Sequence, residues 1–201
     1  MKELTLLIPA YKEVESLPTF LEELKSFDCK KLIVLQGEDQ ETLESISNFD
    51  DIEICIQKKK GYGSALIEGI DEIKTEFFCI INADGSMNPI YLREMLDSCK
   101  NEDLVFASRY LKNGGSDDDN FITLIGNRIF SFIGNVFFKL NLSDILYTYI
   151  LGRTSSAKKL FLKYHDFRIC VEIPILAKFY DLKYISLPSM ERKRIGGKKK
   201  G

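Results

Sequence analysis

Short apolar runs alternate with helical patterns along this chain of 201 residues. Leu17, Leu21 and Leu24 recur at the spacing of one helix face, and a glycine-rich turn at residues 61–63 opens a second apolar helix. Between these patterns lie runs of four or five β-forming residues bounded by polar or turn residues. We therefore predict five strands, at residues 4–8, 32–35, 52–56, 77–81 and 104–107, with the first strand ended by Pro9.

This alternation of strand and helix predicts an α/β domain with a mostly parallel central sheet. A parallel strand needs a crossover connection, and the crossover helices cover both faces of the sheet. Such sheets bind their ligands beyond the carboxyl ends of the strands. The residues that directly follow each strand are therefore the first candidates for a functional site.

The longest apolar stretch covers residues 121–142. It is interrupted by Asn127, Arg128, Asn135 and Lys139, and no uninterrupted apolar run approaches the ~20 residues that a membrane-spanning helix needs. We expect an amphipathic or core helix here and not a membrane span.

Composition narrows the class of protein. The chain is 45% hydrophobic and 29% charged with a formal net charge of −2, which is typical of one globular domain and argues against nucleic acid as the main partner. The five cysteines form no C-x-x-C pair and His165 is the single histidine, so structural zinc is not expected. Without a signal-peptide pattern at the N-terminus, reduced thiols and a cytoplasmic location are the simplest interpretation.

Three strand ends carry polar motifs. The first strand is followed by the motif P-A-Y-K-E (9–13), the fourth by N-A-D-G-S (82–86), and the fifth by S-R-Y (108–110). In the second motif the Asp84 carboxylate follows a buried strand among small residues. One carboxylate in such a place suits Mg²⁺ or Mn²⁺, which takes further oxygens from substrate phosphates and water. The alternative is an ordinary Asp-Gly turn.

These motifs occur together with A-D-G-S-x-x-P (83–89) and a late basic segment, E-R-K-R-I-G-G-K-K-K (191–200). In this order they resemble the family-2 glycosyltransferases of GT-A fold, and among these the chain is most similar to polyprenyl-phosphate sugar transferases typified by dolichyl-phosphate mannose synthase. The resemblance implies a single GT-A (Rossmann-like) domain over residues 1–201. Residues 1–107 would bind the nucleotide-sugar, and residues 108–201 would bind the acceptor.

The resemblance also implies a donor site. Asp84 would be the principal metal ligand, with Asn82 at the first position of the family's D-x-D motif, where a neutral amide is a weaker ligand than a carboxylate. Relatives also carry V-D-D-G-S after the second strand, which this chain lacks, so Gln36 and Asp39 are the substitutes there. The expected donor-binding residues are Pro9, Ala10, Tyr11, Glu13, Gln36, Asp39, Gly61, Gly63, Asn82, Ala83, Arg194, Lys198 and Lys200.

On the acceptor side, the resemblance makes Arg109 and Arg128 the candidates to clamp a phosphate, because a guanidinium matches phosphate oxygens in a bidentate way. Asp144 would orient a sugar hydroxyl or act as a base; the alternative is a helix cap or a partner for Arg153. The polar stretch 111–120 has the composition of a loop that closes over the site.

The implied reaction is inverting transfer from a nucleotide-sugar, with Mg²⁺ or Mn²⁺, to a polyprenyl-phosphate or related cell-envelope glycan acceptor. A lipid acceptor would bring the protein to the inner face of the membrane through a peripheral contact. Two alternatives stay open: transfer to a saccharide hydroxyl in surface-polysaccharide synthesis, and a degenerate GT-A module that binds nucleotide without catalysis.

Overall fold

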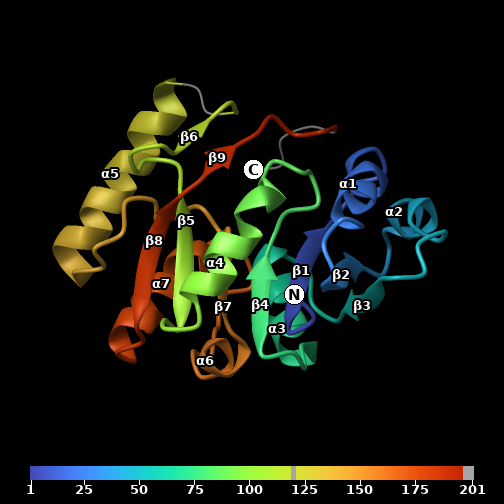
Figure 1. Cartoon of the computed structure of the whole chain (residues 1–201), viewed down its shortest axis with the longest axis horizontal. Coiled ribbons are helices and arrows are strands. Elements are labelled where there is room, and N and C mark those ends of the chain that lie inside the picture. Colours follow the sequence, from blue (N-terminus) through green and yellow to red (C-terminus); the bar gives the residue numbers. More distant parts are fainter. Residues whose placement is uncertain (119–120, 197–201) are drawn as a thin grey trace.

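A computed structural model of the chain describes residues 1–118 and 121–196. At its centre is a seven-stranded sheet with the order β3-β2-β1-β4-β7-β5-β8 (Figure 1). All neighbouring strands pair in parallel except β7, which is antiparallel to both β4 and β5. The strands are β1 (Leu4–Ala10), β2 (Lys30–Gln36), β3 (Glu53–Gln57), β4 (Phe77–Ile80), β5 (Leu104–Ser108), β7 (Ile150–Arg153) and β8 (Tyr184–Pro188).

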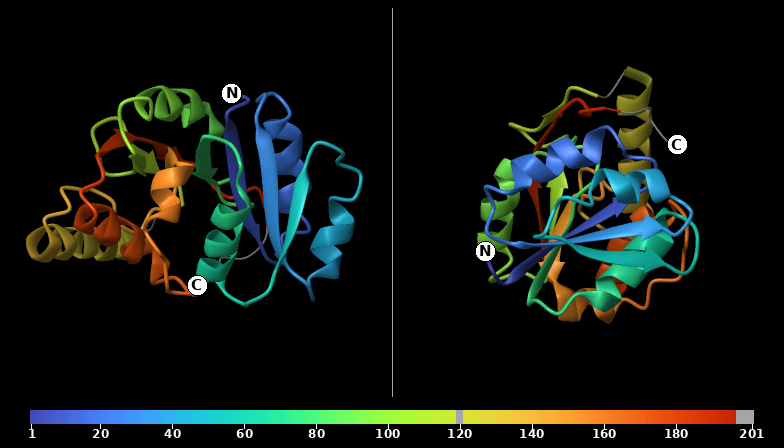
Figure 2. Two further views of the ribbon diagram at one scale, coloured as in Figure 1. Left: turned by 90° about the horizontal axis from the view of Figure 1, so that it is seen from below. Right: turned by 90° about the vertical axis from the view of Figure 1, so that its right-hand side faces the viewer.

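Helices cover both faces of this sheet (Figure 2). The apolar sides of α1 and α4 pack on one face, and those of α3, α6 and α7 pack on the other. A second, two-stranded sheet pairs β6 (Gly115–Ser116) with β9 (Met190–Glu191). The helices are α1 (Ser16–Leu24), α2 (Gln40–Ser45), α3 (Tyr62–Glu72), the 3₁₀ turn η1 (Pro89–Tyr91), α4 (Leu92–Ser98), α5 (Phe121–Phe138), α6 (Thr154–Lys158) and α7 (Ile169–Phe179).

The predicted fold class and all five predicted strands are confirmed. The expected end of the first strand at Pro9 is wrong, because β1 continues to Ala10. Pro9 is opposite Val34 of β2, whereas β4 pairs with β1 only as far as Leu7. A proline, which has no N–H to donate, is tolerated where one of the two neighbouring strands has already ended.

The apolar stretch 121–142 folds as the 18-residue helix α5 and the turn after it. The helix is amphipathic, as one of the two expectations had it, but its most apolar side faces outward and not toward the core. The alternative expectation, a core helix, is therefore ruled out. Within the two described ranges, no helix is both long and apolar enough to cross a membrane.

Candidate active site

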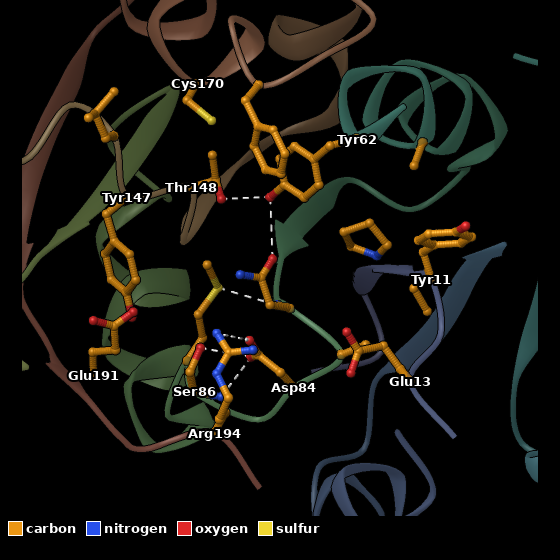
Figure 3. A pocket seen from close by; sticks show the side chains of 18 of the residues that line it. Tyr11, Glu13, Tyr62, Asp84, Ser86, Tyr147, Thr148, Cys170, Glu191 and Arg194 are labelled. Carbon is orange, nitrogen blue, oxygen red and sulfur yellow. Dashed lines mark hydrogen bonds and ion pairs between the residues drawn. The ribbon is translucent and has the colours of Figure 1, made fainter. Parts of the chain in front are cut away.

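A cavity of about 510 Å³ opens at the carboxyl ends of β1 to β5, where a parallel sheet is expected to bind its ligand. Figure 3 shows Tyr11 and Glu13 on one side of it, Tyr147 and Glu191 on the other, and Asp84 between them. Most residues predicted from the sequence line this cavity. They are Pro9, Ala10, Tyr11, Glu13, Gln36, Gly61, Asn82, Ala83, Asp84, Arg109 and Arg194.

The Asp84 carboxylate is held in a fixed orientation by its own turn. The backbone N–H and the hydroxyl of Ser86 both donate to Asp84 Oδ1, at 3.0 and 2.8 Å. The other oxygen, Oδ2, lies 3.4 Å from the Arg194 guanidinium. Gly85 adopts φ +71°, which favours glycine, and so permits this tight turn. One carboxylate oxygen is therefore used by the turn, and the other is directed at a cation.

The segment that follows β9 is bound across the Asp84 turn. Arg192 N–H donates to Ser86 O and Ile195 N–H to Asp84 O, both at 2.8 Å. The Arg192 guanidinium donates to Gly85 O at 2.8 Å and pairs with Glu23 of α1. The Arg194 guanidinium lies within 4 Å of both Asp84 and Asp118. Arg194 of the basic segment therefore lies beside the candidate metal ligand.

Asn82 is oriented by a partly buried tyrosine. The Tyr62 hydroxyl lies 2.7 Å from Thr148 Oγ1, as Figure 3 shows, and 3.3 Å from Asn82 Oδ1. The Tyr62 ring stacks on Phe167 with their centroids 5.0 Å apart. Burial raises the pKa of Tyr62, so its hydroxyl keeps its proton for these bonds. Asn82 therefore presents a fixed amide to the cavity.

Arg109 and Asp144 form a buried ion pair. Arg109 Nε and Nη2 donate to the two Asp144 oxygens at 2.7 and 3.0 Å, and Nη1 donates to Glu191 at 3.1 Å. Burial alone lowers the pKa of Arg109, but the two carboxylates outweigh this effect and raise it. Asp144 is 1% exposed and does not line the cavity. The predicted role of Asp144 as a base or hydroxyl-orienting group is therefore corrected: it positions Arg109.

The glycines of the turn at 61–63 allow close approach of a second segment of the protein. A Cβ would lie 2.1 Å from His165 O if placed on Gly61, and 2.1 Å from Tyr164 O if placed on Gly63. Gly61 also lines the cavity, whereas Gly63 does not. The loop 164–166 also accepts the Ser64 N–H near the start of α3, so it uses part of that helix N-terminus.

Other predicted residues lie outside the cavity. The Asp39 carboxylate is 7% exposed and accepts the Lys12 N–H at 2.6 Å, so it joins the loops after β1 and β2 and is not in contact with the cavity. Arg128 is exposed on α5 with its guanidinium 5.8 Å from the Tyr110 ring. Lys198 and Lys200 lie outside the described residues, as does residue 119 of the predicted closing loop; residues 115–116 of that loop pair with β9.

Several residues that line the cavity are not among those predicted from the sequence. They include Gln57, Tyr62, Ser86, Tyr147, Thr148, Phe167, Cys170 and Glu191. Glu191 is the single acidic residue of the basic segment 191–200. An acid in such a segment is a sequence signal that could have identified it as a candidate site residue. Tyr147 and Phe167 come from connections and Cys170 from the first turn of α7, and only the folded chain shows that these segments meet at the cavity.

The donor atoms at the centre of the cavity suit a hard divalent cation. Asp84 Oδ2 and Asn82 Oδ1 are oxygens, and the Arg194 cation already lies against Asp84. Over residues 1–118 and 121–196, no group of three or more His, Cys, Asp or Glu side chains is arranged to hold a metal. A cation here would take most of its ligands from a bound phosphate group and water.

The chain matches the family model described as "Glycosyl transferase family 2" over residues 5–161. It also resembles solved structures at low sequence identity. One is glucosyl-3-phosphoglycerate synthase from Mycobacterium tuberculosis in complex with Mn²⁺, uridine diphosphate and glucosyl-3-phosphoglycerate. The two structures align with a TM-score of 0.72 and 11% sequence identity, and the alignment covers 98% of this chain and 72% of that one.

A second is mannosyl-3-phosphoglycerate synthase from Rubrobacter xylanophilus, with TM-score 0.65 and 12% identity over 95% of this chain and 67% of that one. A third is S. aureus TarS 1–349, with TM-score 0.59 and 15% identity over 94% and 58%. At these identities the likeness is one of fold.

Proposed function

Because the chain belongs to glycosyl transferase family 2, we propose that it transfers a hexose from a nucleotide-sugar to a polyprenyl-phosphate with inversion. The observation that carries this proposal is the position of Asp84 between the two sides of one cavity, which Asn82 also lines. On one side lie the ends of β1 and β2, and on the other lie Arg109 and α5. Residues 1–107 would thus bind the donor and residues 108–201 the acceptor.

The donor would occupy the side formed by Pro9, Tyr11, Glu13 and Gln36. Tyr11 is 38% exposed and offers a ring face for a base, and Glu13 and Gln36 offer hydrogen-bonding groups. The similar glucosyl-3-phosphoglycerate synthase binds uridine diphosphate with Mn²⁺, which supports a nucleoside diphosphate as the ligand class here.

Asp84 and Asn82 would hold Mg²⁺ or Mn²⁺ at the donor diphosphate. Such an ion neutralises the charge that develops on the leaving diphosphate. Ser86 fixes Asp84 Oδ1, so Oδ2 is the oxygen available to the ion, and Arg194 would exchange its contact with Asp84 for the phosphate oxygens. Arg194 would then add a second positive charge where the leaving group forms.

In this reaction the bond between the sugar C1 and the diphosphate oxygen breaks while a bond to the acceptor phosphate oxygen forms on the opposite face. A phosphate acceptor is already ionised, so no general base is required. Arg109 lines the acceptor side of the cavity, where Nη1 donates to Glu191 and Nη2 donates to Asp144. Asp144 and Glu191 would hold the guanidinium in place for the phosphate, and Arg128 would meet it nearer the surface.

One observation favours a second candidate, transfer to a saccharide hydroxyl. Such an acceptor needs a base, and Glu191 is a carboxylate that lines the acceptor side of the cavity. It lies beside Arg109 and accepts the Ser116 hydroxyl. Under this candidate Glu191, and not the enclosed Asp144, would remove the proton.

Two experiments test the proposal. Calorimetric titration with UDP, GDP and other nucleoside diphosphates plus Mn²⁺ should show binding to one of them, and binding should be lost in Asp84→Ala and kept in the exposed control Asp28→Asn. No binding to any nucleotide would overturn the proposal, and binding without sugar transfer would indicate a degenerate module. Labelled sugar should then pass into organic solvent with a polyprenyl-phosphate acceptor; label that stays in water-soluble glycan, and is lost in Glu191→Gln, would favour the second candidate.

A further inference from the structure

Helix α5 has its polar and apolar sides reversed relative to an ordinary surface helix. Its polar residues recur every four positions and share one face, which lies against the rest of the protein: Thr123, Asn127, Ser131 and Asn135. The opposite face carries only apolar side chains besides Gly126. Eight of them are between 42 and 81% exposed: Ile122, Ile125, Ile129, Phe130, Phe132, Ile133, Val136 and Phe137.

The inward polar face is satisfied by specific bonds. Asn127 donates to the Tyr110 hydroxyl at 2.8 Å, and the Ser131 hydroxyl accepts the Ile145 N–H at 3.2 Å. Asn135 both donates to Leu142 O and accepts the Leu142 N–H, at 2.8 and 3.0 Å. These bonds fix the rotation of the helix about its axis. The apolar face therefore cannot turn inward without breaking them.

The outward face is too large and too uniform for ordinary surface. An 18-residue helix is about 27 Å long, and this face is apolar along its length. Figures 1 and 2 place α5 at one end of the molecule, beyond β8, and no other helix or strand of the described residues covers its outer side. A contiguous exposed apolar patch of this kind marks a site of association with a protein or a membrane.

We propose that the outward face of α5 docks into the surface of a bilayer that contains anionic phospholipid. Arg128 is the one charged residue between positions 121 and 138, and Lys139 follows directly, both exposed. No acidic residue occurs from 121 to 143. An apolar helix face with Arg128 and Lys139 beside it complements anionic headgroups above acyl chains. A protein interface instead surrounds its apolar core with polar groups and forms hydrogen bonds, which this face cannot offer.

The aspartates near the helix lie at its N-terminal end, where Asp117 and Asp118 precede α5. We therefore place the C-terminal part of the helix, with Phe132 and Phe137, deepest in the bilayer. The opposite side of α5 contributes Thr123 and Asn127 to the cavity, so a docked helix would separate the cavity from the lipid by one helix width. This surface is inferred from α5 alone and goes beyond the proposed reaction.

Vesicle flotation of the full chain tests the proposal, using vesicles of neutral phosphatidylcholine with and without phosphatidylglycerol. We expect binding to the anionic vesicles and at least about tenfold weaker binding for Phe132→Gln/Phe137→Gln. Both side chains are 69–75% exposed, so the fold should persist, which a thermal melt checks. Lys139→Gln should weaken binding to anionic vesicles only.

The matched control is Ile54→Gln/Ile90→Gln. These side chains are 44 and 63% exposed but lie on β3 and η1, away from α5, so vesicle binding should be unchanged. Failure of the folded wild type to float, or equal binding by the phenylalanine variant, would overturn the proposal. So would a concentration-dependent dimer in sedimentation velocity that the phenylalanine variant abolishes, since a second copy would then cover the face. Flotation needs neither donor nor acceptor, so its outcome is separate from that of the transferase assay.

Discussion

Replacing Asp144 by Asn tests whether this carboxylate positions Arg109 or performs catalysis. Asp144 accepts three N–H groups of Arg109, from the backbone N and from Nε and Nη2, at 3.2, 2.7 and 3.0 Å. An amide nitrogen cannot accept a hydrogen bond, so at least one of these donors loses its partner. The Arg109 side chain, 8% exposed, would keep Glu191 as a counter-charge.

Removing one partner from a buried ion pair costs about 3–5 kcal/mol. We expect a loss near the lower end, about 3 kcal/mol, because Glu191 stays in place. Urea denaturation at unchanged m-value measures the difference in the free energy of unfolding. The control is Glu76→Gln, which removes the partner of the partly exposed Arg153 and should cost less than about 1 kcal/mol.

The triple variant Arg109→Met/Asp144→Leu/Glu191→Gln separates the cost of an uncompensated charge from the value of the ion pairs, because Glu191 also pairs with Arg109 and would otherwise lose this counter-charge. Replacing all three charged groups together should recover most of the lost stability. The reasoning would be refuted if Asp144→Asn were as stable as wild type and yet lost turnover, because that outcome is the one a catalytic base predicts.

Three further predictions follow from the site. Gly61→Ala should destabilise the fold by about 2–4 kcal/mol, because its Cβ would clash with a backbone oxygen and φ is +111°; Gly126→Ala, with nothing within 4 Å, should raise the melting temperature slightly. Tyr62→Phe should cost about 1 kcal/mol of stability and lower kcat/KM with little change in nucleotide affinity, since it frees the Asn82 amide; unchanged kinetics would contradict that role. Burial raises the pKa of the Cys170 thiol to about 12 from 9.0, so the folded state binds more protons between these values. The free energy of unfolding should fall as pH rises above 9, and by less in Cys170→Ala; equal pH slopes would exclude this contribution.

The fold and the donor side of the cavity were predictable because strand ends are local in sequence. An apolar run followed by a polar motif places Pro9, Glu13 and Asp84 at one edge of a parallel sheet, whatever the helices between them do. The antiparallel β7 was missed because its four residues follow no turn signal, and β8 because its burial is only partial.

The acceptor side was less predictable because it depends on long-range contacts. Asp144 and Arg109 are 35 residues apart, and only the packing of β5 against the turn before β7 shows that they pair. The sequence predicts that Gly61 and Gly63 contact a ligand, but the backbone of residues 164–166 fills the space beside their Cα atoms. A motif marks where chemistry can occur; it does not show which neighbour is protein and which is substrate.

The segment after β9 also sets the order in which the site can form. Arg192 and Ile195 complete the hydrogen bonds of a turn at residues 84–86 that lies more than a hundred positions earlier. Contacts of such sequence separation form late, because the chain must pay the entropy of closing a long loop before they add stability. During synthesis the Asp84 turn would therefore stay without these partners until nearly the whole described chain has emerged. The candidate metal ligand would gain its final geometry as one of the last steps of folding, so an incompletely made chain would lack the finished Asp84 turn.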